Sequence, residues 1–247
     1  MSSICFNPPI IAHRGGAGCA PENTLAAFAN AKTCGVTWVE FDVQITADKQ
    51  VVVFHDETLD RTSNGTGKLV DYSYTDLLTL DVGSWFSSEF NNERIPLFRE
   101  VMQFLAKENM AANIELKPQR GQEEALIIEV IKELQQVALV QSRMLFSSFS
   151  IPALQCLRHY APQYWLGLLM DKWLDNWYEL CQTLQCVSIH VNHQLLDLYR
   201  VQSIKEREKM VLCYTVNSLQ RAEELLAWGI DAIFSDYPEL AQKILRK

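Results

Sequence analysis

The chain has 247 residues, of which 48% are hydrophobic and 21% are charged. This composition is typical of a globular protein with a sizeable core, and it excludes a chain that is disordered throughout. The formal net charge of -8 argues against nucleic acid or an anionic membrane surface as a partner, because such surfaces attract basic proteins. An anionic substrate would need a local group of basic side chains within this acidic protein.

The cysteines and the amino terminus point to a cytoplasmic protein. The 7 cysteines are scattered without a C-x-x-C pair, and so many unpaired thiols are typical of a reducing compartment. The first residues, "MSSICFNPPII", contain no basic segment followed by a long apolar stretch, so we expect no signal peptide. Because no run of about 18 apolar residues occurs, we predict no membrane-spanning helix and no stable membrane association.

Short runs of strand-forming residues alternate with longer segments of helical periodicity along the chain. The predicted strands are residues 9–12, 37–43, 111–116, 144–147, 164–169, 186–190, 210–215 and 232–235. The predicted helices are residues 24–34, 97–108, 123–136, 152–160, 174–184, 194–208, 219–228 and 238–245. Such strand-then-helix units predict an α/β fold with parallel strands, and eight of them predict a closed TIM (β/α)8 barrel. An open doubly wound sheet is the alternative, but the first strand is not followed by a G-x-G-x-x-G turn.

The unit after the second predicted strand is longer than the others. Between Val53 and Leu97 the chain is rich in turn residues such as Asn64-Gly65 and Gly67. Long unstructured loops are rare in compact domains, so we predict a small inserted subdomain over about residues 57–95, beside a loop end of the barrel. No linker divides the rest of the chain, and we predict a single domain over residues 1–247.

Acidic side chains lie at the predicted carboxyl ends of the second and third strands, where the loops of such a barrel meet over the active site. Glu40 and Asp42 are two residues apart and therefore project to one side, and Glu115 ends the third strand. Three carboxylates in one barrel mouth repel one another unless a cation lies among them, and oxygen ligands favour Mg²⁺ or Ca²⁺. We predict that these carboxylates bind a divalent metal; the alternative is that lysines and backbone amides satisfy them.

Two histidines and two cationic side chains complete the predicted site. His13 and Arg14 follow the first strand directly, and His55 follows the apolar run "VVVF". One histidine at a strand end is usually structural, but two beside a metal form an acid and base pair. Arg14 and Lys117 would hold a phosphate, or else form ion pairs with the carboxylates. The sequence leaves open which histidine is the acid.

Five further residues have roles that the sequence leaves open. Glu22 either holds its neighbours in place or contacts substrate, and Trp85 either packs the insertion or lines a channel. His190 either packs in the barrel or points into the site. Phe149 and Asn217 belong to the active face by position alone.

Six segments together resemble the glycerophosphodiester phosphodiesterase family, close to its cytoplasmic bacterial type. They are "AHRGGAGCAPENTLAAF", "VEFDVQIT", "VVVFHDETLDRTSNGTG", "NIELKP", "YTVNS" and "WGIDAIFSDYP". The resemblance implies a (β/α)8 barrel with an insertion after the second strand. It also implies that His13 and His55 are catalytic, that Glu40, Asp42 and Glu115 bind Mg²⁺ or Ca²⁺, and that Arg14 and Lys117 contact phosphate.

The activity that this resemblance implies is hydrolysis of glycerophosphodiesters, such as glycerophosphocholine or glycerophosphoethanolamine, to glycerol 3-phosphate and an alcohol. The expected partner is a small phosphodiester, and the oligomeric state is not predicted. A lysophospholipase-D-like enzyme that acts on acylated substrates is the nearest alternative, and a wide apolar groove beside the insertion would favour it. A binder of glycerophosphodiesters without catalytic activity is the other alternative.

Overall fold

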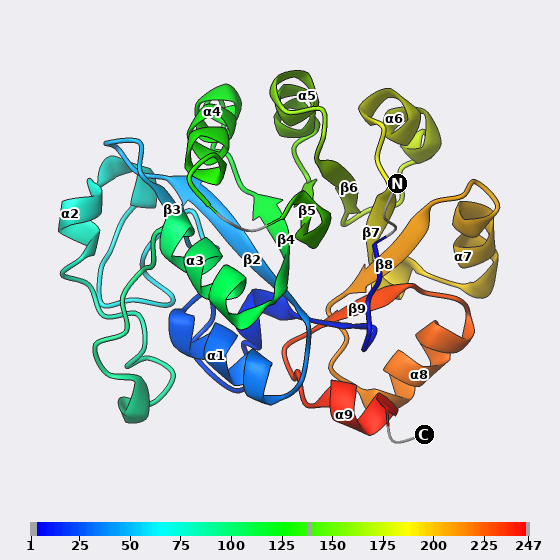
Figure 1. Cartoon of the computed structure of the whole chain (residues 1–247), viewed down its shortest axis with the longest axis horizontal. Helices are drawn as coiled ribbons and strands as arrows, with labels where there is room; N and C mark the ends of the chain where they lie inside the picture. The colour runs from blue at the N-terminus through cyan, green and yellow to red at the C-terminus, as the bar shows by residue number, and fades with distance from the viewer. Residues whose placement is uncertain (1–3, 138–139, 246–247) are drawn as a thin grey trace.

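The computed structural model describes residues 4–137 and 140–245, and within them eight parallel strands form a closed barrel (Figure 1). The strands are β1 (Ile10–Ala12), β2 (Trp38–Ile45), β4 (Ala111–Leu116), β5 (Met144–Ser148), β6 (Trp165–Met170), β7 (Ser188–Asn192), β8 (Met210–Tyr214) and β9 (Ala232–Ser235). Strand β1 closes the barrel because it pairs in parallel with both β9 and β2. The predicted (β/α)8 barrel is therefore confirmed.

In the described part of the chain, eight helices follow the barrel strands and surround them (Figure 1). They are α1 (Leu25–Thr33), α3 (Phe98–Glu108), α4 (Glu123–Leu134), α5 (Ile151–Tyr160), α6 (Trp177–Leu184), α7 (Leu198–Lys205), α8 (Leu219–Ala227) and α9 (Leu240–Leu245). The predicted helix 194–208 begins later, because the Asp197 side chain accepts a hydrogen bond from the backbone N–H of Arg200 and caps α7. His193–Leu195 forms a separate 3-10 turn.

The barrel strands place successive side chains alternately inside and outside the barrel. Val39 and Phe41 of β2 belong to the large core beneath the outer helices, where the Phe41 ring contacts the Phe28 ring at 5.6 Å between centroids. Ile11 and Leu145 belong to a smaller buried cluster inside the barrel. The residues of β2 that alternate with these outward-facing ones therefore point toward the barrel interior.

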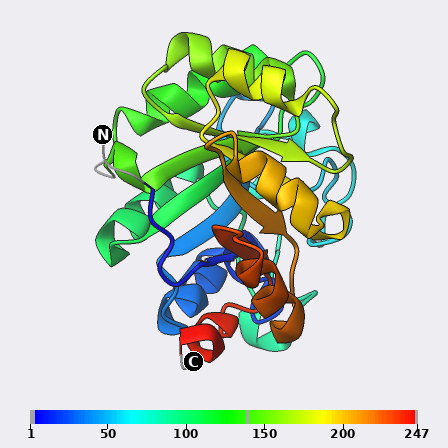
Figure 2. The same cartoon turned by 90° about the vertical axis from the view of Figure 1, so that its right-hand side faces the viewer.

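The oversized unit after β2 forms an insertion beside the barrel. Strand β3 (Val51–Val53) pairs antiparallel with β2, and the chain then forms η2 (Leu69–Asp71), α2 (Tyr74–Leu77) and η3 (Ser88–Phe90). These elements have a hydrophobic cluster of their own, with Leu59, Leu69 and Leu77 fully buried. In Figure 2 the insertion, in cyan, lies at the end of the barrel toward which the strand arrows point.

The aromatic residues of the insertion pack on one another. The Phe86 ring contacts the rings of Trp85 and Phe90 edge to face, each at 5.7 Å between centroids. These ring contacts agree with the packing alternative for Trp85. Among residues 4–137 and 140–245, no helix is long and apolar enough to span a membrane.

Candidate active site

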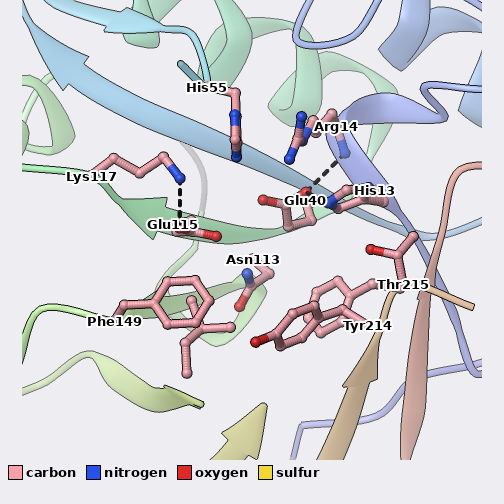
Figure 3. Close-up of a pocket in the computed structure, with 12 residues that line it drawn as sticks. His13, Arg14, Glu40, His55, Asn113, Glu115, Lys117, Phe149, Tyr214 and Thr215 are labelled. Carbon is pink, nitrogen blue, oxygen red and sulfur yellow. Dashed lines mark hydrogen bonds and ion pairs between the residues drawn. The ribbon is translucent and has the colours of Figure 1, made fainter. Parts of the chain in front are cut away.

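A cavity of about 260 Å³ opens at the carboxyl ends of the barrel strands (Figure 3). Six of the seven residues predicted for the site line it, and the seventh, Asp42, is buried with 1% exposure. The lining residues are His13, Arg14, Glu40, His55, Asn113, Glu115, Lys117, Phe149, Leu169, Tyr214, Thr215 and Phe234. The structure thus brings together residues that are more than 100 positions apart in the sequence.

A tight turn after β1 carries His13 and Arg14 into the cavity. Arg14 has a positive φ of 51°, and its backbone N–H donates a hydrogen bond of 2.8 Å to Glu40 Oε2. At Gly15, a Cβ atom would lie 2.8 Å from the Cβ of Ala27. The turn therefore needs glycine at this position, because α1 packs directly against its backbone.

The carboxylates of Glu40, Asp42 and Glu115 form one cluster, in which the potential ligand atoms lie within 4.8 Å of one another. Burial raises the pKa of Glu40 well above its usual range, and the negative charges of Asp42 and Glu115 raise it further. Burial and the charge of Asp42 raise the pKa of Glu115 to about 7. A cation among these oxygens would remove this repulsion, so the cluster has the donor set that holds a hard metal ion.

Asp42 has the opposite behaviour, because it lies beside both cationic side chains of the site. Burial would raise its pKa, but Lys117 and Arg14 outweigh burial and hold the pKa below its usual range. Asn23 donates a hydrogen bond of 2.9 Å to Asp42 Oδ2. The other oxygen, Oδ1, is buried without a hydrogen-bond partner among the described residues. Asp42 thus has one oxygen fixed in place and one available to a ligand.

Arg14 and Lys117 form ion pairs with the carboxylates. Arg14 Nε lies 3.6 Å from Asp42 Oδ2, and Lys117 Nζ lies 3.2 Å from Glu115 Oε1 and 3.7 Å from Asp42 Oδ1. Arg14 Nε is nevertheless buried without a hydrogen-bond acceptor in the described part of the chain. Ion pairing therefore leaves donor capacity for an anionic ligand at this position.

The imidazole of His13 is held by a carboxylate from the opposite end of the chain. His13 Nδ1 lies 2.6 Å from Asp236 Oδ1, and Asn217 Nδ2 donates to Asp236 Oδ2 at 2.7 Å. Burial would raise the pKa of Asp236, but the hydrogen bond from His13 outweighs burial and lowers that pKa. Because an ionised carboxylate can only accept, the proton lies on Nδ1 and leaves Nε2 free. His13 Nε2 lies 3.9 Å from Glu40 Oε2.

The imidazole of His55 has an equivalent carboxylate partner. His55 Nδ1 lies 2.5 Å from Asp56 Oδ1, so Nε2 again points away from the carboxylate and into the cavity (Figure 3). Burial lowers the pKa of His55, and the positive charges of Arg14 and Lys117 lower it further. The negative charge of Asp42 and, to a smaller extent, the hydrogen bond to Asp56 oppose this effect but do not reverse it.

A network of ion pairs connects Asp56 to Arg14 through the insertion. Arg61 donates to Asp56 through Nε at 2.6 Å and through Nη2 at 3.0 Å. The same guanidinium donates to Glu22 at 2.8 and 2.7 Å, and Glu22 accepts a hydrogen bond of 2.8 Å from Arg14 Nη1. Glu22 therefore holds Arg14 in place, which is the structural alternative for this residue. The network fixes both Arg14 and the partner of His55.

Two histidines near the barrel lie outside this cavity. His190 is fully buried, its Nε2 lies 2.9 Å from Ser188 Oγ, and its ring packs against Phe234 at 5.3 Å. Burial lowers the pKa of His190 to about 3, so the ring is neutral and packs in the core. His193 lies in the turn before α7 and does not line the cavity.

The side of the cavity opposite the cationic side chains is largely apolar. Phe149 and Tyr214 meet edge to face at 6.1 Å between centroids, and the Tyr214 hydroxyl donates to the backbone carbonyl of Met170. Asn113 donates to Ser147 Oγ at 2.9 Å, while its Oδ1 is buried without a partner in the described residues. This wall suits a small ligand with both carbon atoms and hydroxyl groups.

The chain matches the family model of the glycerophosphoryl diester phosphodiesterase family over residues 13–240. The protein belongs to this family. A glycerophosphodiester phosphodiesterase of Caldanaerobacter subterraneus is 34% identical over 242 residues, which are 96% of this chain and 98% of that protein. One from Bacillus altitudinis is 32% identical over 238 residues, 95% of this chain and 97% of that protein.

A solved structure agrees with the fold of this phosphodiesterase. An Oleispira antarctica phosphodiesterase, in complex with the product sn-glycerol-3-phosphate, matches it with a TM-score of 0.94 and 36% identity, over 97% of each chain. The resemblance seen in the sequence motifs is thus confirmed, and the chain is confirmed as a member of an enzyme family.

Sequence reasoning missed several side chains around the cavity of this phosphodiesterase. Asp236 follows β9 directly, so the rule that active residues lie at strand ends would have found it. Asp56 is adjacent to His55 and was visible only as part of an "HD" pair. Asn23 lies directly before Thr24, the residue that caps α1, and no pattern in the sequence indicates its hydrogen bond to Asp42. No local pattern marked Arg61, whose partners come from other parts of the chain.

Proposed function

We propose that this protein is a metal-dependent phosphodiesterase that hydrolyses glycerophosphodiesters, such as glycerophosphocholine or glycerophosphoethanolamine, to glycerol 3-phosphate and an alcohol. One observation carries the proposal. His13 and His55, each held through Nδ1 by a carboxylate, face one cavity beside the three-carboxylate cluster. Two imidazoles next to an anion-binding site are the groups that move protons in phosphodiester hydrolysis.

We propose that Glu40, Asp42 and Glu115 hold Mg²⁺ or Ca²⁺. Their oxygens form a compact hard-donor set, and the unpartnered Oδ1 of Asp42 fits a ligand role. A bound divalent cation would supply positive charge to the phosphate oxygens. The repulsion that raises the pKa values of Glu40 and Glu115 supports this assignment, because it disappears when a cation lies among the carboxylates.

Arg14 and Lys117 bind the substrate phosphate in this proposal. Both line the cavity, and Arg14 Nε has no hydrogen-bond acceptor in the described part of the chain. Their positive charges would hold the two phosphate oxygens that are not ester-linked and stabilise the charge that builds up on them. Glu22 and Arg61 position the Arg14 guanidinium through the ion-pair network.

The two histidines carry the proton transfers. A neutral histidine accepts the proton of the attacking hydroxyl at Nε2 while the new oxygen–phosphorus bond forms. The other histidine, protonated, donates from Nε2 to the leaving oxygen as the bond between phosphorus and the alcohol breaks. The attacking group is either the neighbouring glycerol hydroxyl, which gives a cyclic phosphate that water opens in a second step, or water itself. The Nδ1 hydrogen bonds to Asp236 and Asp56 keep each ring oriented during these transfers.

Acylated substrates fit the structure less well. A second cavity lies between the insertion and the loop after β4. It is lined by Gln44, His55, Glu57, Lys68, Lys117, Pro118, Gln119 and Arg120. These side chains are mostly polar or charged, whereas an acyl chain needs an apolar groove. We therefore propose that the phosphodiesterase acts on water-soluble substrates.

Because the described cysteines are all free thiols, we also propose a reducing, cytoplasmic location for the protein.

The test is an assay of glycerol 3-phosphate release from glycerophosphocholine by protein that has been freed of metal and then supplied with Mg²⁺ or Ca²⁺. We expect release only with metal. Binding of glycerophosphocholine without release of glycerol 3-phosphate would instead show that the protein is a binder without catalytic activity. Release of choline and acylated glycerol 3-phosphate from lysophosphatidylcholine, without release of glycerol 3-phosphate from glycerophosphocholine, would favour the lysophospholipase-D-like alternative.

A further inference from the structure

A second cavity, of about 420 Å³, adjoins the proposed catalytic cavity and shares His55 and Lys117 with it. It lies between the start of the insertion, which supplies Glu57 and Lys68, and the loop after β4, which supplies residues 118–120. Because the two cavities meet at His55 and Lys117, a phosphodiester bound in the first can extend one of its two substituents into the second.

Hydrogen bonds within the protein hold part of the wall of this second cavity in place. Gln44 Nε2 donates hydrogen bonds to the backbone carbonyls of Phe54, His55 and Asp56, at 2.9, 3.2 and 2.8 Å. Gln44 is itself buried, with 3% exposure. These three hydrogen bonds fix the backbone that carries His55 between the two cavities.

The charges around the second cavity favour an anion. Lys68 pairs with Glu57 at 2.9 Å, and Lys117 pairs with Glu115 at 3.2 Å. Arg120 is exposed and makes no hydrogen bond or ion pair with any residue in 4–137 or 140–245. Among the described residues, Arg120 is therefore the cationic side chain of this cavity whose charge no neighbouring carboxylate compensates.

A hydrogen-bond donor beside the second cavity also favours an anionic ligand. Gln119 Nε2 is buried and has no acceptor among the described residues, although Gln119 lines the cavity. Apart from the imidazole of His55, the lining contains no aromatic side chain. Quaternary ammonium groups are usually recognised by aromatic rings, so this lining does not suit a choline group.

We propose that the second cavity binds the leaving alcohol of the substrate and selects alcohols that carry negative charge. This inference rests on the proposed phosphodiesterase function. The first cavity offers the glycerol unit its apolar wall of Phe149, Leu169 and Tyr214, which leaves the second cavity for the other ester substituent. Arg120 and Gln119 then supply the positive charge and the donor that distinguish an anionic alcohol from a cationic one.

The test compares two substrates whose leaving alcohols differ in charge. In bis(glycerophospho)glycerol the leaving alcohol carries a second phosphodiester anion, whereas in glycerophosphocholine it carries a quaternary ammonium. Cleavage of the first ester in either substrate adds one water and releases one glycerol 3-phosphate, so initial rates in a single assay give kcat/KM for both. We expect the ratio of the two kcat/KM values to favour the anionic substrate, and the preference to weaken as ionic strength rises.

Arg120→Glu is the decisive variant, and Arg120→Gln is the milder one. A unit charge about 7 Å away in water-like surroundings changes affinity by roughly threefold. Arg120→Glu changes the charge by two units, and the change weakens binding of the anionic substrate while it strengthens binding of the cationic one. We therefore expect the ratio to fall by roughly 50- to 80-fold at low ionic strength, mainly through KM. Lys107→Glu on α3 is the matched control, since Lys107 is exposed and lines neither cavity. Its ratio should equal that of the wild type.

Three results would count against the inference in different ways. If both substrates are hydrolysed and neither Arg120 variant changes the ratio, the second cavity does not select the alcohol and the inference is wrong. If neither substrate is hydrolysed in the presence of Mg²⁺ or Ca²⁺, the proposed function fails and the inference fails with it. A ratio that shifts equally in Lys107→Glu would assign the effect to overall charge and would also overturn the inference.

Discussion

Replacing Arg61 with alanine tests how far the proposed site depends on the insertion. Arg61 is neither a proposed metal ligand nor one of the residues that line the cavity, yet its guanidinium makes two hydrogen bonds to Asp56 and two to Glu22. Through Asp56 it orients His55, and through Glu22 it orients Arg14. Arg61 is therefore a positioning residue for a proton-transfer group and for a phosphate-binding group.

The expected effects follow from this geometry. Hydrogen bonds to charged groups contribute about 1.5–3 kcal/mol, but the Arg61 side chain is 46% exposed and solvent screens such pairs. We expect Arg61→Ala to lower the free energy of unfolding by only about 1–2 kcal/mol. Small displacements of catalytic groups have larger kinetic costs, and we expect kcat to fall by roughly 10- to 100-fold with a smaller change in KM.

The assay is steady-state hydrolysis of glycerophosphocholine, with unfolding followed by circular dichroism. Arg61→Lys should recover part of the loss, because lysine keeps the charge but cannot form paired hydrogen bonds with two carboxylates. Arg94→Ala is the control inside the insertion, where the Arg94 side chain donates, within the described part of the chain, only to the backbone carbonyl of Leu80. A wild-type kcat in Arg61→Ala, or an equal loss of kcat in Arg94→Ala, would refute the positioning role.

Three other predictions concern the histidines and the carboxylates. His13→Ala and His55→Ala should each lower kcat by about 10²-fold or more with the fold intact, and near-normal turnover in either variant contradicts their assignment as proton-transfer groups. The activity of the wild type should give a bell-shaped pH profile. Removal of metal by a chelator should abolish activity, and Mg²⁺ or Ca²⁺ should restore it; full activity in metal-free protein contradicts the carboxylate site. Because the folded-state pKa values of Glu40 and Glu115 are raised, metal-free protein should lose stability as pH rises from about 4.3 through about 7. Added metal should therefore raise Tm more at about pH 8 than at about pH 5, as calorimetry can measure.

The parts of the site that follow from local pattern were predictable. Alternation along β2 places Glu40 and Asp42 on the side opposite Val39 and Phe41, which pack under the helices. The strand-end rule then brings Glu115 to the same barrel mouth. The same reasoning predicted the barrel, because eight strand-and-helix units have one closed arrangement that buries every strand.

The parts that depend on contacts between distant segments were not predictable. His13 and Asp236 are separated by 223 positions, and the sequence contains nothing that specifies their hydrogen bond before the barrel closes between β1 and β9. Glu22 and Arg61 meet because the insertion folds back over the turn after β1, and no periodicity encodes that path. Periodicity predicts which side of an element faces the core, but not which loop side chains pair above it.

The balance of charge in the first cavity connects the proposed metal to the proposed substrate. Three carboxylates, two of them buried and that of Glu115 partly exposed, face two cationic side chains, Arg14 and Lys117, so one negative charge is left when all of them are ionised. A phosphodiester anion would be repelled by such a site. A divalent cation among the carboxylates reverses the sign of the site and makes it attractive to the substrate. At a pH at which Glu40 and Glu115 are both ionised, substrate binding itself, and not only the chemical step, should therefore require metal. Calorimetric titration with glycerol 3-phosphate at such a pH should give no binding heat in metal-free protein. Equal product affinity with and without metal would refute this argument while leaving the family assignment intact.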